Sequence, residues 1–321
     1  MLALRFYGRR DIRLEEVPTP KVKEDEVLVE VTDAGISQTQ INEFVEGPFI
    51  IQKTPLIPSQ EYGGIVDGEL VAVLPLLSCK KCEYCLNKKE HLCDNIEYYG
   101  LIGEDGGFCE YSAVKKDNIF KVKKRELITF VEPILVAIHA ARKLNLDNKR
   151  VLVLGAGAIG VSVASVIRDY FKADVLINDI LYPRMDRAKA AGLEVIEKDK
   201  IKDKFDIVID AAGMDTLISK PALNEAFERV KKGGVVLNIG TYFHSLSFIP
   251  SNLLIQEVSL IESFAYNLSD VEILDDVLDS LKIDFSKLIE YIRLKDIIED
   301  GYFRAEIDKE SFTRIVVEPW W

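Results

Sequence analysis

The stretch RVLVLGAGAIGVSVASVI, residues 150–167, constrains the fold more than any other part of this 321-residue chain. It begins with a continuous apolar run, which is typical of a parallel strand buried on both faces. A glycine-rich turn and an apolar pattern with helical spacing follow. Further strand-like runs, ADVLIND, FDIVIDAAG and GVVLNIG, alternate with helical segments. This alternation predicts an α/β fold with a doubly wound parallel sheet.

The turn GAGAIG matches the Gly-x-Gly-x-x-Gly pattern of a dinucleotide site, and it stands between a strand and a helix, as that pattern requires. The first glycine makes the tight turn, and the second lets the backbone approach a pyrophosphate at the helix N-terminus. The third permits close packing of the helix on the strand. We therefore predict a Rossmann domain with cofactor-binding residues Gly155, Gly157, Ala158, Ile159 and Gly160.

Asp179 ends the second apolar strand, nineteen residues after Gly160. A carboxylate at this place accepts hydrogen bonds from the adenosine ribose and repels a 2′-phosphate, so it predicts NAD rather than NADP. Arg184 lies close enough to leave NADP as an alternative. Gly240, at the end of GGVVLNIG, is a further candidate for cofactor contact, although loop geometry alone accounts for a glycine there equally well.

Four of the five cysteines lie within fifteen residues, in the spacing C-x2-C-x2-C-x7-C. Four thiolates complete a tetrahedral zinc shell and leave no open position for a substrate, so we predict one structural Zn²⁺ per chain. An iron–sulfur cluster, disulfides and a metal-free loop are the alternatives. The bacterial iron–sulfur pattern places proline after its fourth cysteine, whereas Asp94 follows here. The predicted ligands are Cys79, Cys82, Cys85 and Cys93.

The charge balance narrows the choice of partners. Lys and Arg number 41 against 53 Asp and Glu, which gives a net charge of −12. Nucleic acids and anionic membranes both favour a basic surface. No apolar run reaches the ~18 residues of a membrane span, and the start of the chain lacks a signal-peptide pattern. We therefore expect a cytoplasmic protein that binds a small-molecule substrate, with neither nucleic acid nor membrane as a partner.

The chain resembles the medium-chain dehydrogenases of the zinc alcohol dehydrogenase type, in particular the polyol, butanediol and threonine dehydrogenases. The resemblance covers nearly the whole chain. Besides the cysteine cluster and GAGAIG, it rests on AGIS at 34–37, PSQEYGG at 58–64, DGGFCEYSAV at 105–114 and VEPILVAIHA at 131–140.

This resemblance implies a GroES-like, mainly β catalytic domain made of residues 1–136 and 266–321, with a structural zinc lobe at 79–93. A Rossmann domain at 137–265 lies between the two segments. The tail after residue 266 shows no core of its own, so we expect it to pack on the N-terminal part. Relatives of this type are commonly homo-oligomers, which implies a dimer or a tetramer.

The family also implies a second, catalytic zinc, and here the sequence departs from the family pattern. Ser37 stands where a cysteine ligand is typical, and Gln60 stands where a histidine is typical. Glu61 and Glu132 match the two acidic positions, while Thr39 matches the hydroxyl that passes the proton. Serine and glutamine are poor zinc ligands. We therefore expect a metal-free polar cluster, with zinc or a harder ion such as Mg²⁺ or Mn²⁺ as alternatives.

The three histidines add no clear ligand. His91 lies in the cysteine loop and is expected to be exposed. His139 sits in an apolar run, which favours a packed histidine with a hydrogen-bond partner. His244 follows a glycine-rich strand end and is a weaker candidate for facing the cofactor.

The expected function is hydride transfer between NAD and a small alcohol, polyol or ketone, without catalytic zinc. Ser37 and Thr39 would bind the substrate oxygen, and Glu61 or Glu132 would accept the proton. The alternatives are a zinc-free reductase of the quinone or enone type and a non-catalytic NAD-binding protein. Turnover of a panel of alcohols, polyols and enones distinguishes these functions. The predicted catalytic residues are Ser37, Thr39, Glu61 and Glu132.

Overall fold

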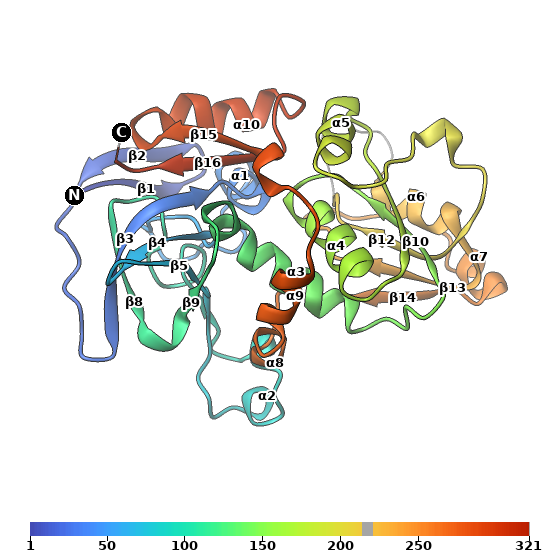
Figure 1. Ribbon diagram of the computed structural model, residues 1–321, viewed down its shortest axis with the longest axis horizontal. Helices are drawn as coiled ribbons and strands as arrows, with labels where there is room; N and C mark the ends of the chain where they lie inside the picture. Colours follow the sequence, from blue (N-terminus) through green and yellow to red (C-terminus); the bar gives the residue numbers. More distant parts are fainter. Residues whose placement is uncertain (214–220, 321) are drawn as a thin grey trace. The chain divides into compact units, whose positions relative to one another are not determined.

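The computed structural model describes residues 1–213 and 221–320, and the chain forms two compact units (Figure 1). Unit 1 contains residues 1–133 together with 289–321, and unit 2 contains residues 134–288. Both ends of the chain therefore contribute to unit 1. The glycine-rich turn lies in unit 2, and the cysteine cluster lies in unit 1.

The second division lies further along the chain than the predicted boundary at 266. Residues 267–288 belong to unit 2, so the expectation that the whole tail packs on the N-terminal part is wrong for this segment. It contains α8 (Leu268–Val271) and α9 (Leu274–Ser280). The buried Asp270 accounts for this placement, because its carboxylate lies 2.7 Å from Nδ1 of His139 and 2.6 Å from Nη1 of Arg142 in the same unit.

Unit 1 is built on a seven-stranded sheet in the order β15-β16-β3-β4-β5-β9, with β8 also paired to β3. The C-terminal strand β16 runs antiparallel to β3 and brings Val316 opposite Gly35. Alternating apolar residues of these strands face a core that contains Phe44, Tyr62 and Phe108. The strands are β3 (Glu26–Gly35), β4 (Tyr62–Val66), β5 (Glu69–Val73), β8 (Tyr111–Lys115), β9 (Ile119–Lys121), β15 (Ile289–Arg293) and β16 (Arg314–Glu318).

Unit 1 also contains two smaller strand pairs and, among its described residues, four α-helices, of which α3 continues into unit 2. Strands β1 and β2 pair antiparallel, and β6 with β7 flank the cysteine lobe. The elements are β1 (Leu2–Gly8), β2 (Asp11–Glu16), β6 (Leu76–Leu77), β7 (Glu97–Tyr98), α1 (Gln38–Val45), α2 (Glu83–Leu86), α3 (Val131–Ala141) and α10 (Arg304–Ile307).

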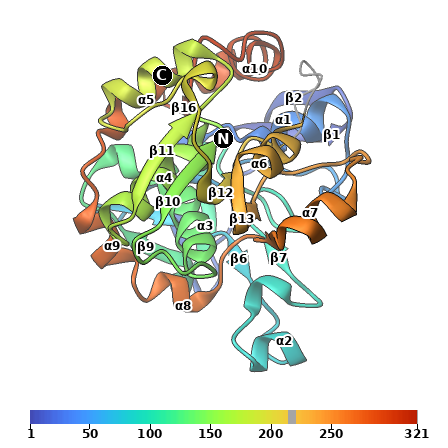
Figure 2. The same ribbon diagram turned by 90° about the vertical axis from the view of Figure 1, so that its right-hand side faces the viewer.

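Unit 2 contains a five-stranded parallel sheet in the order β11-β10-β12-β13-β14 (Figure 2). A parallel bridge between Ile177 and Val195 extends it beyond β11. This arrangement confirms the predicted doubly wound parallel sheet. The strands are β10 (Arg150–Leu154), β11 (Asp174–Asn178), β12 (Phe205–Asp210), β13 (Val230–Asn238) and β14 (Ser259–Glu262).

The helices of unit 2 follow the predicted alternation with one difference. After α6 the segment VKKGG (230–234) does not continue the helix but forms the start of β13, because the buried β-branched Val230 pairs with Phe205. No helix among the residues described here is long and apolar enough to cross a membrane. Besides α8 and α9, the α-helices of unit 2 in the described residues include α4 (Ala158–Asp169), α5 (Tyr182–Ala190), α6 (Ala222–Arg229) and α7 (Pro250–Gln256).

Candidate functional site

The cysteine lobe holds four sulfur atoms within 4.8 Å of one another. The Sγ atom of Cys82 lies 3.5 Å from that of Cys85 and 3.8 Å from that of Cys93, and Cys79 lies 3.9 Å from Cys85. Four sulfurs at ~2.3 Å from a central zinc would be about 3.8 Å apart. The spacing fits a tetrahedral zinc shell and is far longer than a disulfide bond of ~2.05 Å. The disulfide alternative is therefore wrong.

The lobe also arranges the charge of these thiols. Hydrogen bonds from the backbone N–H groups of Lys81 and Cys82 lower the pKa of Cys79 to about 6. Burial raises the pKa of Cys93 to about 12, so a cation is needed before that thiol ionises at neutral pH. A bound metal would supply that charge and hold the lobe in shape. His91 is only 6% exposed, so its predicted exposure is wrong.

The turn between β10 and α4 has the geometry expected for the glycine pattern. Gly155 has a φ of +104°, a conformation that favours glycine. A Cβ atom on Gly160 would lie 1.8 Å from the carbonyl oxygen of Gly155, so that position tolerates no side chain. Gly157, Ala158 and Ile159 begin the helix and are half-buried. Their backbone is accessible at the positive end of the helix dipole, where a phosphate is favoured.

Asp179 lies against this glycine turn. One carboxylate oxygen accepts a hydrogen bond from the N–H of Ala156 at 2.7 Å, and the other accepts from the N–H of Leu181 at 2.8 Å. Arg184 of α5 approaches the same turn, because a Cβ on Gly157 would lie 4.0 Å from its Nη1 atom. The structure therefore brings the predicted glycines, Asp179 and Arg184 to one place.

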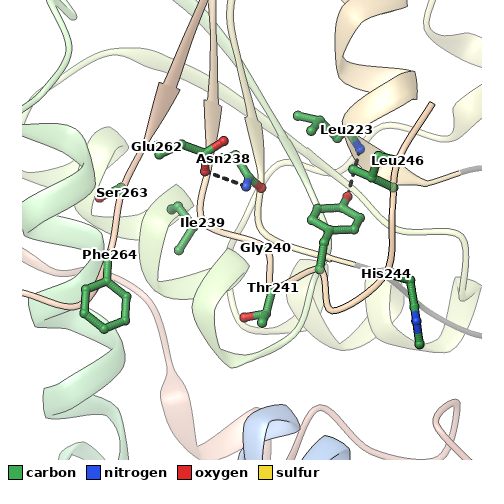
Figure 3. Close-up of a pocket in the computed structure, with 11 residues that line it drawn as sticks. Leu223, Asn238, Ile239, Gly240, Thr241, His244, Leu246, Glu262, Ser263 and Phe264 are labelled. Atoms are coloured by element: carbon green, nitrogen blue, oxygen red, sulfur yellow. Dashed lines mark hydrogen bonds between the residues drawn. The ribbon is translucent and has the colours of Figure 1, made fainter. Parts of the chain in front are cut away.

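A hollow of about 500 Å³ opens at the carboxyl ends of β13 and β14 (Figure 3). Within the described chain, Oδ1 of Asn238 and Oγ of Ser263 are buried in its wall without a hydrogen-bond partner. Tyr242 donates its hydroxyl proton to Asp210 and accepts from the N–H of Leu223. The lining residues are Leu223, Asn238, Ile239, Gly240, Thr241, Tyr242, His244, Leu246, Glu262, Ser263 and Phe264.

Gly240 and His139 of unit 2 can also be compared with the sequence predictions. A Cβ on Gly240 would lie 2.4 Å from the backbone nitrogen of Gly213. Close packing of two loops therefore requires glycine there, whether or not a cofactor touches it. His139 is buried and paired with Asp270, which confirms the prediction of a packed histidine.

The polar cluster of unit 1 forms where β3, β4 and β16 meet. The N–H of Gly35 donates to the carbonyl of Glu61 at 2.8 Å, and the N–H of Ile36 donates to the carbonyl of Ile315 at 3.0 Å. These bonds bring the end of β3 and the start of β16 beside the start of β4. Ser37, Glu61 and Arg314, the residues next to these bonds, are all buried.

The neutral half of the cluster is a hydrogen-bond network, which Gln60 joins to the charged half by donating to Oε1 of Glu61 at 3.3 Å. Gln60 accepts from Nε2 of Gln40 at 2.7 Å and donates to Oγ of Ser37 at 3.1 Å. Ser37 caps α1, because its Oγ also accepts from the N–H of Gln40 and its own N–H donates to Oε1 of Gln40. The structure thus joins Ser37 and Gln60 as predicted and adds Gln40, which the sequence analysis missed.

The charged half consists of two carboxyl groups and one guanidinium. Arg314 forms an ion pair with Glu61 and donates from Nη2 to the carbonyl of Thr129 at 2.7 Å. Tyr98 donates to Oε1 of Glu132 at 2.8 Å. Burial, and then the neighbouring charge of Glu61, raise the pKa of Glu132 to about 8. Burial also raises the pKa of Glu61, and the Arg314 guanidinium opposes that rise.

This donor set does not match a catalytic zinc site. In the described part of the chain, the four cysteines are the only group of three or more Cys, His, Asp or Glu side chains close enough to hold a metal. Glu61 already pairs with a cation, and Ser37 and Gln60 hydrogen-bond to each other. Thr39 lies half-buried in the first turn of α1. Arg314 and Tyr98 were not foreseen; the one available signal was a lone arginine at the start of the apolar strand RIVVEP.

Comparisons with known proteins agree with this division of the chain. Residues 23–124 match the alcohol dehydrogenase GroES-like domain, and residues 136–241 match the NAD binding domain of D-isomer specific 2-hydroxyacid dehydrogenases. Sorbitol dehydrogenase of Bombyx mori is 27% identical over 81% of this chain and 82% of its own length. The (R,R)-butanediol dehydrogenase of Saccharomyces cerevisiae is 26% identical over 99% and 98%.

The fold is likewise that of a known dehydrogenase. The crystal structure of 2R,3R-butanediol dehydrogenase from Bacillus subtilis superposes with a TM-score of 0.82 at 22% identity, covering 99% of both chains. A GroES-like domain joined to an NAD-binding domain defines an oxidoreductase of the alcohol dehydrogenase type. These similarities support the predicted resemblance of the chain to the medium-chain, zinc-type alcohol dehydrogenases.

Proposed function

We propose that this oxidoreductase moves a hydride between NAD and a small alcohol, polyol or ketone without a catalytic zinc. The observation that carries the proposal is the cluster of Ser37, Gln60, Glu61 and Glu132, which lacks thiolate and imidazole and contains the guanidinium of Arg314. NAD supplies the hydride chemistry, and the chain binds the cofactor and handles the proton. The relatives named as sorbitol and butanediol dehydrogenases support the alcohol or polyol class.

The cofactor residues follow from the two polar regions of unit 2. The N-terminus of α4 at Gly157 to Ile159 binds the pyrophosphate. Asp179 binds the adenosine ribose, since each carboxylate oxygen can accept a further hydrogen bond beyond its backbone partner. In the hollow, Oδ1 of Asn238 would accept from the N–H₂ of a bound nicotinamide carboxamide, and Oγ of Ser263 would donate to its carbonyl. Both atoms are otherwise buried without a partner among the described residues.

Ser37 is the hydrogen-bond donor for the substrate oxygen. A hydroxyl has two acceptor positions and one proton. Oγ of Ser37 accepts from the N–H of Gln40 at 3.3 Å and from Nε2 of Gln60 at 3.1 Å. Both acceptor positions are then used, so the Ser37 proton is available for the substrate. Thr39, two residues on, supplies a second hydroxyl.

Glu132 is the group that exchanges the proton. A general base works best when its pKa lies near the operating pH. Glu132, with its pKa raised to about 8, meets this condition, whereas Glu61 is paired with Arg314. Of the two carboxyl groups that the sequence left open, the proposal therefore assigns proton exchange to Glu132.

The lack of thiolate and imidazole in this cluster also supports a second candidate, a zinc-free reductase of activated C=C bonds. Hydrogen bonds alone can stabilise an enolate, so Ser37 and Thr39 would suffice for that reaction. A non-catalytic NAD-binding protein is the remaining alternative.

We further propose a cytoplasmic location, where thiolates stay reduced.

A homo-oligomer, a dimer or a tetramer, is part of the same proposal. Strand β14 is an edge of the sheet, and the nearby helix α7 buries none of its residues. Leu254 and Ile255 on α7 are both 77% exposed. An unpaired edge beside exposed apolar side chains favours association with another chain. Sedimentation velocity would contradict this part of the proposal if the protein remained monomeric at micromolar concentration.

The function is tested by metal analysis together with a substrate panel. We expect one zinc per chain, and NAD-dependent turnover of at least one secondary alcohol, polyol or ketone. A second zinc per chain would contradict the metal-free mechanism. Turnover of enones alone would select the C=C reductase, and tight NAD binding without any turnover would select the non-catalytic protein.

Asp179→Ala should weaken NAD binding and narrow the preference for NAD over NADP. The ribose loses a charge-assisted hydrogen bond of about 1.5–3 kcal/mol, which corresponds to roughly 10- to 100-fold in Kd. Dissociation constants for both cofactors are the measurement. Asp179→Asn is the control, because it keeps an acceptor for Ala156 while removing the charge that repels a 2′-phosphate. Tighter binding of NADP than of NAD by the unmodified protein would contradict the assignment and point to Arg184.

A further inference from the structure

Arg314 is an arginine in the interior of unit 1. Its side chain is 1% exposed, and that of Glu61, its ion-pair partner, is 4% exposed. The guanidinium also donates to the carbonyls of Thr129 and Ile36 and lies over the ring of Phe130, 5.7 Å from its centre. A buried charge in such surroundings is costly unless it is paired.

The chain makes room for this guanidinium. A Cβ atom on Gly35 would lie 1.9 Å from Nη2 of Arg314, so any side chain at Gly35 would displace it. Arg314 is the first residue of β16, and Gly35, the last residue of β3, has no side chain to occupy the space that the guanidinium fills. The position of the guanidinium is therefore fixed by the pairing of β16 with β3.

The guanidinium touches only one of the two carboxyl groups. Arg314 pairs with Glu61, whereas Glu132 accepts a hydrogen bond from the neutral Tyr98. The charge of Glu61 also raises the pKa of Glu132, so the two carboxyl groups influence each other. The charged and titratable groups facing Glu132 are thus Glu61, Arg314 and Tyr98. One cation compensates one carboxylate, and two buried carboxylates side by side repel each other.

We propose that Arg314 is a positioning residue that divides the roles of the two carboxyl groups: its guanidinium keeps Glu61 ionised, and Glu132 is left as the group that carries the exchangeable proton. No metal is needed for this division. The inference rests on the proposed function in one respect only, namely that the proton of Glu132 is exchanged with the substrate. The protonation states themselves are properties of the protein without substrate.

The test is infrared spectroscopy of the full chain with its glutamate side chains labelled with ¹³C. The label separates the C=O band of a protonated glutamic acid from that of aspartic acid, and Glu132→Gln identifies the contribution of Glu132. The unmodified protein should show this band at pH 7 and lose it as the pH rises through about 8.

Three variants give different expected results. In Arg314→Met both carboxyl groups are protonated at pH 7, so the band should roughly double. Arg314→Lys keeps the charge and should keep a single band. In Glu61→Gln the guanidinium is free to pair with Glu132, so the midpoint of the Glu132 band should fall by about one pH unit or more.

The control is Arg304→Met, which removes an arginine from Glu290 on the surface of the same unit, where the Glu290 side chain is 41% exposed. It should leave the band unchanged. A folded Arg314→Met protein with the band intensity and midpoint of the unmodified protein would overturn the proposal. If that variant does not fold, an unchanged midpoint in Glu61→Gln overturns it instead.

This outcome is independent of the proposed reaction. A protein that turns over none of the tested substrates would still show the expected bands. Conversely, the enzyme could be active while the Glu132 band stays unchanged in the Arg314 and Glu61 variants. That result would support the proposed function and contradict this inference.

Discussion

Glu132→Gln is expected to lower kcat/KM for hydride transfer by about 100- to 10,000-fold, the usual contribution of a general acid or base. Glutamine keeps the size of the side chain and the acceptor for Tyr98, but it cannot exchange a proton at neutral pH. NAD binding should be unchanged. Initial rates in both directions, with Kd for NAD from the same preparation, are the measurement.

The pH dependence of the rates in the two directions tests the same role of Glu132. Alcohol oxidation needs the carboxylate, so its rate should rise as the pH increases through about 8, where Glu132 ionises. Ketone reduction needs the acid, so its rate should fall over the same range. Tyr98→Phe removes a hydrogen bond that lowers the pKa of Glu132, and it should move both profiles to higher pH.

Asp33→Asn is the matched control for Glu132→Gln. Asp33 is also a buried carboxyl group of unit 1 whose pKa is raised by burial, and it is paired with Arg125. It lies outside the cluster, so its replacement should leave the pH profile in place. Activity of Glu132→Gln within about threefold of the unmodified enzyme would exclude Glu132 as the proton-exchanging group.

The raised pKa of Glu132 also has a cost in stability. In the unfolded chain a glutamate ionises near 4.5, whereas the folded protein keeps Glu132 protonated up to about 8. Between these two values the folded state binds the extra proton, so the contribution of Glu132 to stability falls as the pH rises. This cost is consistent with a group retained for its chemistry.

The features that were predictable from the sequence are those that depend on residues close together along the chain. GAGAIG with Asp179, and the cysteine spacing, each depend on a short stretch whose geometry is largely local. The boundary after 266 was missed, because the contact of Asp270 with His139 joins residues that no short pattern connects. The same is true of Arg314 and Glu61, which meet only because β16 pairs with β3 beside the start of β4.

Ser37 shows a different limit. Its position in AGIS indicated a departure from the family motif. The spacing Ser37-x-x-Gln40 is that of a capping box, so the cap on α1 was predictable from neighbouring residues, whereas the hydrogen bond from Gln60 was not. That hydrogen bond depends on where Gln60 lies in space. Residue type therefore predicted that zinc ligands were missing, and only the structure shows which groups contact one another in that cluster.

Cys79→Ser and Cys93→Ser are each expected to remove about one zinc per chain and to lower the free energy of unfolding by several kcal/mol. Binding of a structural zinc is coupled to folding, and its full apparent value in zinc-finger peptides is about 10–16 kcal/mol. The lobe offers little else to hold it, because α2 is four residues long and buries only Cys85. Zinc content by mass spectrometry and thermal unfolding with and without a chelator are the measurements.

Cys109→Ser is the control for these two variants. Cys109 is the fifth cysteine, buried outside the lobe, where its thiol donates to the carbonyls of Gly106 and Tyr111. A serine hydroxyl can donate in the same way, so this variant should retain its zinc. NAD binding, which depends on unit 2, should survive in all three proteins. Zinc content that stays unchanged in both Cys79→Ser and Cys93→Ser would mean that the four sulfur atoms, although correctly spaced, do not hold the metal.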